Sequence, residues 1–342
     1  MMGGMTDSLA PLTDSFGRTV RDLRVSVTDR CNFRCTYCMP AEGMVWQDRS
    51  DLLTFEEITR MVGVFTSRLG VTGVRLTGGE PTVRAHLPVL VERLAALEVR
   101  PELAMTTNGA TLRLVADDLR NAGLDRLNIS CDSLIRERFA AMTRRDALPA
   151  VLDGIQAAKE AGFASIKVNC VLIRGTNDDE IVDFARFGRE QGVGVRFIEF
   201  MPLDADGRWQ ADAVVASSEV LERVAAMFPI EAVDTNGPEP AARFRYVDGG
   251  GLAGGAELGV IPSVTQPFCG SCDRVRVTAD GQFRTCLFAQ DENDLRAILR
   301  GGGTDDDLEA AVRRAVAGKW AGHSIGQVTF IRPPRSMSQI GG

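Results

Sequence analysis

The chain has 342 residues, a length that fits one large α/β domain or two domains of ordinary size. Apolar residues make up 44% of it and charged residues 25%, which excludes a wholly disordered chain and leaves enough apolar material for a large core. The formal net charge of −7 argues against a protein that binds nucleic acid through a basic surface.

No targeting or membrane segment is visible in the sequence. Residues 1–14 lack a basic start followed by an apolar run, and no stretch reaches the ~20 apolar residues that a membrane helix needs. We therefore expect a cytoplasmic protein with neither a membrane nor a nucleic acid as partner. Eight cysteines are too few for a disulfide scaffold at this length, so grouped thiols indicate metal or redox chemistry.

Residues 22–203 alternate short apolar strands with amphipathic helices. The clearest helix begins after Thr54, which forms a capping box with Glu57. Six such units predict parallel strands joined by right-handed crossovers, and six are fewer than the eight of a closed TIM barrel. The fold class is therefore α/β, a partial (β/α)6 TIM-like barrel. The expected strands are Asp22–Thr28, Gly73–Gly79, Glu102–Asn108, Arg126–Ser133, Ile166–Arg174 and Val195–Leu203.

The composition and pattern of the sequence change after a last barrel helix, expected at Ser217–Phe228. An edge strand at Phe244–Val247 lies in a loop rich in Gly, Pro and Ala, and a hairpin is expected around Ala279-Asp280-Gly281. Its strands are Arg274–Thr278 and Gln282–Leu287, and helices near Asp291–Leu299 and Thr304–Ala317 follow. We expect an N-terminal extension (1–15), a barrel (16–230) and a smaller C-terminal hairpin-plus-helices region (231–342) that closes the barrel mouth.

Polar and apolar residues alternate along the expected strands, a pattern that a sheet packed solidly on both faces would not show. Because successive side chains point to opposite faces and the helices must cover the apolar face, the polar sets line the barrel interior. An antiparallel sheet with one wet face is the alternative, which the intervening helices disfavour. Cys131 and Cys170 fall on the apolar faces as inert thiols. The inside residues include Arg24, Arg75, Thr106, Lys167 and Arg196, a lining suited to an anionic ligand.

The first cysteine cluster follows the first expected strand. Cys31, Cys35 and Cys38 have the spacing C-x3-C-x2-C, and three thiolates within eight residues can wrap one inorganic cluster. Three cysteines leave one iron of a four-iron cluster free for an outside ligand. Zinc is the alternative, but structural zinc prefers four ligands and neither His86 nor His323 is near in the sequence.

The second cluster lies in the C-terminal region. Cys269, Cys272 and Cys286 have the spacing C-x2-C-x13-C, with Cys286 on the returning strand of the expected hairpin. Arg274 and Arg276 stand two apart on one strand, so both guanidinium groups share a face and can clamp phosphate oxygens. A three-cysteine site beside this pair suggests a cluster whose open iron faces a substrate, with structural zinc again as the alternative.

Several motifs carry a family resemblance. The first cysteine motif, with Tyr37 before its last cysteine, and Gly78-Gly79-Glu80-Pro81 one strand later resemble the radical S-adenosylmethionine family. With the second cysteine cluster, the chain from about Phe16 to its end resembles the GTP 3′,8-cyclases, the radical enzymes that begin molybdenum cofactor biosynthesis. The further matching segments are Leu23–Thr28, Thr106–Gly109, Phe200–Leu203 and the terminal Gly341-Gly342.

The resemblance implies a set of site residues and two [4Fe-4S] clusters. One cluster, on Cys31, Cys35 and Cys38, would bind S-adenosylmethionine; the other, on Cys269, Cys272 and Cys286, would meet the guanine base. The contacts implied for S-adenosylmethionine are Tyr37, Gly79, Ser130 and Met201. Those implied for GTP are Arg24, Arg75, Thr106, Lys167, Arg274, the backbone of Val275 and Arg276, with Arg196 as a further cavity residue.

The activity implied is conversion of GTP to (8S)-3′,8-cyclo-7,8-dihydroguanosine 5′-triphosphate. A 5′-deoxyadenosyl radical would take hydrogen from C3′, and the carbon radical would add to C8. The first cysteine cluster, Arg274 and Arg276 would form the catalytic set, and the Gly341-Gly342 tail would reach toward it. An external electron donor, product transfer to cyclic pyranopterin monophosphate synthase and a homodimer are further expectations. The alternatives are a radical S-adenosylmethionine enzyme that acts on a peptide and a non-enzymatic zinc or electron-transfer protein.

Overall fold

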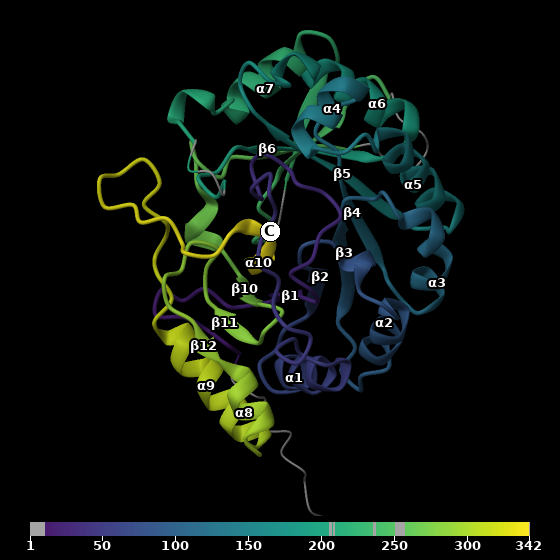
Figure 1. The fold of residues 1–342 in the computed structure, drawn as a ribbon. Helices are drawn as coiled ribbons and strands as arrows, with labels where there is room; N and C mark the ends of the chain where they lie inside the picture. The colour runs from purple at the N-terminus through teal and green to yellow at the C-terminus, as the bar shows by residue number, and fades with distance from the viewer. Residues whose placement is uncertain (1–10, 205–206, 208, 235–236, 250–256, 342) are drawn as a thin grey trace, which may run out of the picture.

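The computed structural model describes residues 11–204, 207, 209–234, 237–249 and 257–341. Its centre is a twelve-stranded sheet in the order β12-β11-β10-β1-β2-β3-β4-β5-β6-β9-β8-β7, whose strands curve into a partial barrel (Figure 1). The six expected barrel strands are present, adjacent and parallel. They are β1 (Asp22–Ser26), β2 (Gly73–Thr77), β3 (Glu102–Thr107), β4 (Arg126–Ser130), β5 (Ser165–Leu172) and β6 (Gly194–Glu199).

The C-terminal region extends both edges of this barrel. Strand β9 (Glu257–Ile261) pairs with β6 and strand β10 (Arg274–Val277) pairs with β1, both in parallel. The remaining strands pair antiparallel at the two margins of the sheet. They are β7 (Ile230–Val233), β8 (Ala242–Tyr246), β11 (Gln282–Arg284) and β12 (Asn293–Asp294). The partial barrel is confirmed, and its parallel run is longer than the six strands that the sequence pattern predicts.

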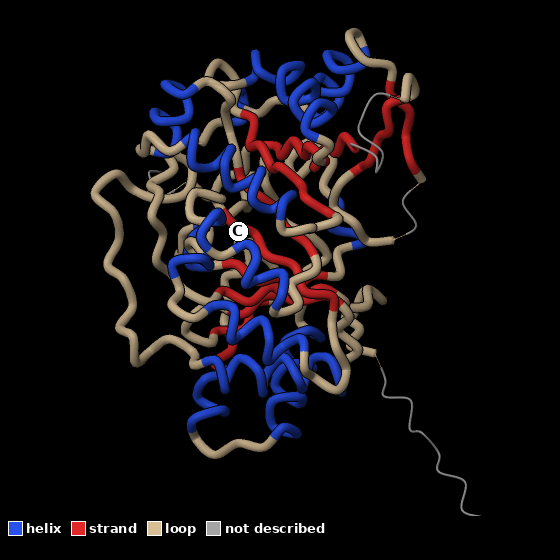
Figure 2. Tube along the Cα trace, turned by 90° about the vertical axis from the view of Figure 1, so that its right-hand side faces the viewer, coloured by secondary structure: helices blue, strands red, loops and turns tan. Residues whose placement is uncertain are grey.

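Helices cover the outside of the strands, as Figure 2 shows from the side. Thr54 and Glu57 form the expected capping box at the start of α1 (Phe55–Ser67). The apolar residues of β1 and β2 are buried with Ile58, Met61 and Phe65 of this helix, which fixes the polar residues on the inside. The other barrel helices are α2 (Leu87–Ala95), α3 (Ala116–Asn121), α4 (Arg136–Thr143), α5 (Leu148–Glu160), α6 (Ile181–Gln191) and α7 (Ser217–Ala225).

The C-terminal helices pack against the first barrel helix and enter the barrel. Helices α8 (Leu295–Arg300) and α9 (Asp305–Ala317) lie beside α1, where Arg60 bonds Asp305 at 2.8 Å and Arg300 bonds Glu57 at 2.7 Å. The last helix, α10 (Met337–Ile340), which the sequence pattern did not predict, lies inside the ring of strands in Figure 1. Short 3-10 turns occur at Pro81–Val83, Leu112–Leu114, Asp178–Glu180, Ala211–Ala213 and Phe268–Ser271.

The structure describes only part of the expected N-terminal extension (1–15). Residues 1–10 of the expected N-terminal extension lie outside the described residues, whereas Leu12 and Asp14 are buried. None of the helices in the described parts of the chain has the length and apolar character needed to span a bilayer.

Candidate active site

One cavity of about 500 Å³ runs through the barrel and meets both cysteine clusters. The loop with Cys31, Cys35 and Cys38 follows the end of β1, whereas Cys269 and Cys272 precede the start of β10. Because β1 and β10 are parallel and in register, the two loops lie at opposite ends of this strand pair. The five residues of β1 span about 16 Å. The cavity therefore separates two three-thiol groups by a distance that leaves room for ligands between them.

Most of the predicted site residues line this cavity. They are Arg24, Cys31, Cys35, Tyr37, Cys38, Arg75, Gly79, Thr106, Ser130, Arg196, Met201, Cys269, Cys272, Arg274, Arg276 and Cys286. Lys167 and Val275 are not part of the lining: Val275 is fully buried within β10, and the charge of Lys167 interacts with those of Arg196 and Arg126. Cys131 and Cys170 are buried, as predicted.

The first three thiols lie close to one another in a buried loop. The pKa of Cys31 is raised to about 11, by burial and by the charge of Glu80, and that of Cys38 to about 12, by burial and by the charges of Cys31 and Asp132. Burial also raises the pKa of Cys35, to which the charges of Asp132 and the other two cysteines add. These raised pKa values favour the neutral thiols, so a bound metal would have to stabilise the thiolates by direct coordination.

The two glycines after β2 allow this loop to pack tightly. A Cβ atom on Gly78 would lie 2.3 Å from the carbonyl oxygen of Thr28, and one on Gly79 would lie 2.3 Å from that of Arg30. Gly78 also has a φ of 141°, which L-residues with side chains rarely adopt. The adjacent Glu80 is buried and accepts hydrogen bonds from the Asn108 amide and the Thr107 hydroxyl. The Gly-Gly-Glu motif thus supports the backbone just before Cys31.

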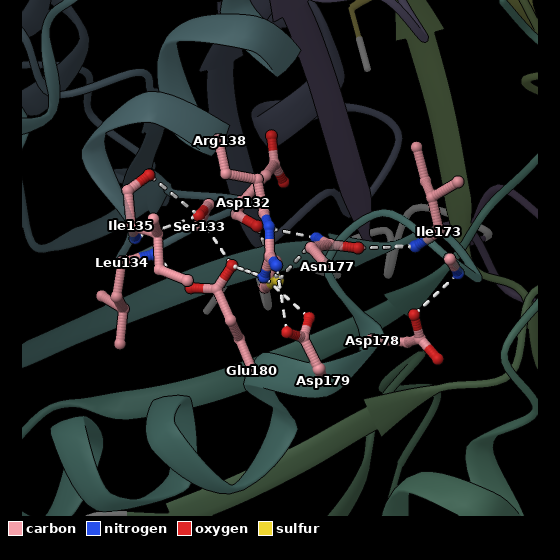
Figure 3. Close-up of polar contacts among 12 residues, drawn as sticks. Asp132, Ser133, Leu134, Ile135, Arg138, Ile173, Asn177, Asp178, Asp179 and Glu180 are labelled. Carbon is pink, nitrogen blue, oxygen red and sulfur yellow. Dashed lines mark hydrogen bonds and ion pairs between the residues drawn. The ribbon is translucent and has the colours of Figure 1, made fainter.

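A buried polar network positions the side chain next to Cys38. The Tyr37 hydroxyl donates to Asp132 at 2.6 Å, and the Val171 amide donates to the same carboxylate at 2.9 Å. Behind Asp132, the Asn177 side chain donates to the carbonyl oxygen of Asp132 (Figure 3). It also donates to the carbonyl oxygen of Val171.

The same network continues through Glu180. This residue accepts hydrogen bonds from the Ser133 hydroxyl at 2.7 Å and the Leu134 amide at 2.6 Å, and forms an ion pair with Arg138 (Figure 3). Burial raises the pKa of Asp132 to about 6, against the lowering effect of its hydrogen bond from Tyr37. The loops after β4 and β5 are thereby fixed against the first cysteine loop.

In the second set of thiols, the surroundings of Cys272 are cationic. Burial raises the pKa of Cys272, but the charges of Arg274 and Lys319 outweigh it and leave this pKa below its ordinary value. The Arg274 guanidinium lies over the Phe268 ring at 4.6 Å. Cys286 comes two residues after β11 ends at Arg284, rather than on the strand as the sequence suggested. The predicted β10–β11 hairpin itself is present.

The protein satisfies the cations of the lining only in part. The buried Nε atoms of Arg24, Arg75 and Arg274 have no hydrogen-bond partner within the described parts of the chain. Burial, together with the nearby charge of Arg274, lowers the pKa of Arg276 to about 10. Buried, unpartnered guanidinium groups are costly unless a ligand satisfies them. Their grouping fits an anionic ligand with several acceptor oxygens.

The C-terminal tail enters the same space. Arg276 donates to the carbonyl oxygen of Gly341, and a Cβ atom there would lie 2.5 Å from the Thr77 hydroxyl and 2.6 Å from that of Ser26. A side chain is therefore excluded at Gly341, whose φ is 69°. Gly342, the last residue of the expected tail, lies outside the described residues.

Several lining residues were not among the predicted site residues. Arg126 has the same strand parity as Asn128 and Ser130, so the alternation along β4 contains the signal that would have placed it inside. It bonds Glu102 at 2.6 Å. Glu239, by contrast, comes from an irregular loop without any such period, and its carboxylate lies 3.8 Å from Arg196.

The cysteine positions fit iron–sulfur clusters. All six cysteines are free of disulfides, and within each set of three the thiols interact electrostatically. No set of three or more His, Cys, Asp or Glu side chains in the described ranges converges on one point as a single-ion site requires. A four-iron cluster does not need this convergence because each cysteine binds a different iron. The donor set and its spacing therefore suit a cluster better than zinc.

Comparison with known proteins first defines the class. Residues 25–188 match the Radical SAM superfamily model, and residues 193–325 match the Molybdenum Cofactor Synthesis C model. The fold resembles that of Streptococcus suis SuiB bound to S-adenosylmethionine, with a TM-score of 0.54 at 14% identity over 86% of this chain and 68% of that one. The chain is a radical S-adenosylmethionine protein, a class that uses S-adenosylmethionine and an iron–sulfur cluster.

The full-length relatives define the family more narrowly. The chain is 49% identical to the GTP 3′,8-cyclase of Streptomyces coelicolor, over 97% of this chain and 96% of that protein. It is 48% identical to the GTP 3′,8-cyclase of Mycolicibacterium smegmatis, over 97% of this chain and 92% of that protein. The chain belongs to the GTP 3′,8-cyclase family.

Proposed function

We propose that this protein is an enzyme that converts GTP to (8S)-3′,8-cyclo-7,8-dihydroguanosine 5′-triphosphate, the first step of molybdenum cofactor biosynthesis. The observation that carries the proposal is one cavity with three cysteines at each end and several buried arginines between them, some of which have a buried Nε atom without a hydrogen-bond partner in the described parts of the chain. Two [4Fe-4S] clusters, held by Cys31, Cys35 and Cys38 and by Cys269, Cys272 and Cys286, account for both sets of thiols.

The radical chemistry belongs to the cofactors. Cys31, Cys35 and Cys38 would hold the first cluster, which with S-adenosylmethionine would supply a 5′-deoxyadenosyl radical able to take hydrogen from C3′ of GTP. Bond formation between that carbon and C8 would then need one electron, which the external donor would supply, and one proton to complete the dihydro product. The protein contributes orientation and the exclusion of water. Tyr37, Gly79, Ser130 and Met201 hold S-adenosylmethionine at the carboxyl ends of the strands. Met201 can do so because β6 ends at Glu199, which frees it from the strand alternation.

The barrel cations hold the triphosphate. Arg24, Arg274, Arg276 and the backbone of Val275 lie on β1 and β10, and Arg75 lies beside Arg24 on β2. Thr106, Lys167 and Arg196 continue the set on β3, β5 and β6. Asp22, Glu102 and Glu239 offset part of this charge in the free protein, at 4.0, 2.6 and 3.8 Å from Arg75, Arg126 and Arg196. A peptide substrate would leave these cations unpaired, whereas a triphosphate pairs with them.

The wider setting follows from the same activity. The enzyme works in the cytoplasm, receives electrons from an external donor and passes its product to cyclic pyranopterin monophosphate synthase. A homodimer is the assembly we propose. The barrel (16–230) and the C-terminal region (231–342) act together, because each carries one set of cysteines at the shared cavity.

Anaerobic incubation with GTP, S-adenosylmethionine and dithionite tests the proposal. We expect 5′-deoxyadenosine and the cyclised triphosphate in equal amounts, from protein that holds about eight iron per chain in two four-iron clusters. Zinc without sulfide, or 5′-deoxyadenosine formed without any cyclised product, would contradict it. A peptide-modifying enzyme would bind neither GTP nor its analogues in a titration.

A further inference from the structure

The turn that carries Cys269 and Cys272 is held from behind by two cations that do not line the cavity. These are Arg18, which precedes β1, and Lys319, which follows α9. Both are buried, with 8% and 3% of their surface exposed. Neither can touch a substrate in the cavity, so the reaction proposed above does not use them directly.

Lys319 bonds the backbone on both sides of Asp273. Its Nζ atom donates to the carbonyl oxygen of Cys272 at 3.1 Å and to that of Arg274 at 2.8 Å, and it lies 3.9 Å from the Cys272 sulfur. One ammonium group therefore links a cysteine of the second set to the first residue of β10. An ammonium suits this position because its donors diverge from one compact charge, unlike the planar fork of arginine.

The use of lysine here is unusual for this chain. Only Lys159, Lys167 and Lys319 occur among its 39 basic residues. Lys159 lies on helix α5 and bonds Gln191 at 3.4 Å, far from the second cysteine turn in sequence. It offers a matched control for any change at Lys319.

Arg18 completes the clamp around this turn. Its guanidinium donates to the carbonyl oxygens of Cys269 and Ala321, both at 2.7 Å, and to that of Trp320 at 2.5 Å. Its Nε atom bonds Asp14 at 2.6 Å, which fixes the fork in place. The N-terminal segment and the segment after α9 are thus tied to the same cysteine turn.

We propose that Lys319, supported by Arg18, is a positioning residue for the second cluster: it holds Cys272 and Arg274 in place and supplies a second positive charge, besides that of Arg274, near the Cys272 sulfur. This inference rests on the proposed function, because it assumes a cluster on Cys269, Cys272 and Cys286. A cationic donor beside a ligating thiolate stabilises the more negative, reduced state and raises the reduction potential. Through Arg274, the same contact sets the geometry of the GTP clamp.

The test compares the full-length, cluster-loaded protein with Lys319→Met, Lys319→Arg and Lys159→Met. A redox titration followed by electron paramagnetic resonance measures the reduction potential of the second cluster, and equilibrium titration measures GTP affinity. In Lys319→Met we expect a more negative potential and about tenfold weaker GTP binding, the loss of one hydrogen bond to the clamp backbone. Lys319→Arg keeps the charge and restores most of the potential. Lys159→Met behaves as the unmodified protein.

The outcomes separate this inference from the proposed function. Unchanged potential and GTP affinity in Lys319→Met would overturn the inference alone. If Lys319→Met loses the second cluster, retention of iron in Lys319→Arg supports a charge requirement, and loss in both variants refutes it. A variant with Cys31, Cys35 and Cys38 all changed to Ala should keep about four iron. If it holds none while Lys319 is present, the second cluster itself is absent and the proposed function fails with it.

Discussion

The two cysteine sets of this barrel have the same number of thiols but differ in the charges beside them: burial raises the pKa of Cys269 in the second set as it does throughout the first, whereas the pKa of Cys272 is lowered. Around the first, burial is the largest influence on each thiol, and the carboxylates of Glu80 and Asp132 add to it, so all three pKa values are raised. Around the second, Arg274 and Lys319 reverse the effect of burial at Cys272. A three-cysteine motif therefore defines what can be bound, while the residues around it define how the bound group behaves.

This difference bears on electron flow. A cluster in the first environment is disfavoured from taking up negative charge, which suits a strong reductant. A cluster in the second accepts an electron more readily because cations lie beside its ligands. Each of the following changes tests the division between the two sets, beginning with the largest expected effect.

Removal of one thiol from either set should abolish product formation in different ways. Cys35→Ala should lose both 5′-deoxyadenosine and cyclised product. Cys286→Ala should still cleave S-adenosylmethionine but leave GTP unconverted, because only the second set is damaged. Iron analysis and chromatography of both nucleoside products measure this, with Cys131→Ala as a control for a buried thiol outside both sets. Full cyclase activity in Cys286→Ala would contradict the assignment of GTP conversion to the second set of cysteines.

Loss of a clamp arginine should weaken substrate binding without affecting the cofactor. Arg274→Ala removes a charge-assisted contact worth about 1.5–3 kcal/mol, so GTP should bind about 10- to 100-fold more weakly. The affinity for S-adenosylmethionine should not change, since its contacts lie at the other end of the barrel. Isothermal titration with each ligand distinguishes the two, and Arg300→Ala, which breaks contacts with Glu57, Ser50 and Leu52 outside the cavity, is the control. Equal weakening of both ligands would mean a general distortion.

The pH dependence of GTP binding should reveal Lys167. Burial, together with the charges of Arg196 and Arg126, lowers its pKa to about 8. Lys167 is therefore cationic below this value and loses its charge as the pH rises through it, so GTP affinity should fall above about pH 8. Lys167→Arg should remain charged and bind GTP equally well from pH 7 to 9. A pH profile that is identical in the two proteins would remove Lys167 from the phosphate site.

The smallest expected effect comes from the network behind the first set. Tyr37→Phe deletes the hydroxyl that donates to Asp132 and leaves a buried carboxylate with fewer partners, which costs about 1–3 kcal/mol. We expect a lower unfolding temperature and weaker binding of S-adenosylmethionine, with GTP affinity unchanged. Thermal unfolding and titration measure these effects. A weakened GTP site in this variant would show that the two ends of the cavity are not independent.

Much of this site could be predicted because local rules decide it. The period-2 alternation of the strands placed Arg24, Arg75 and Arg196 on the inside, and the cysteine spacings marked both sets of thiols. The parallel pairing of β9 and β10 with the barrel could not be predicted this way. Both strands are short and their barrel partners, β6 and β1, are distant in sequence, so no local pattern encodes the pairing. The positions of Lys319 and Arg18 could not be predicted for the same reason, because no neighbouring residue in the sequence indicates contacts with the second cysteine turn.

The pairing of β10 with β1 also has a consequence for how the chain reaches this structure. Strand β1 is among the first segments to leave the ribosome, yet its outer neighbour begins only at Arg274, and β6 must likewise wait for β9. During synthesis the barrel therefore has two unpaired edges, which are prone to intermolecular pairing until the last quarter of the chain arrives. Such non-local pairing is slow. Production of this protein should accordingly benefit from slow translation at low temperature more than from stronger expression.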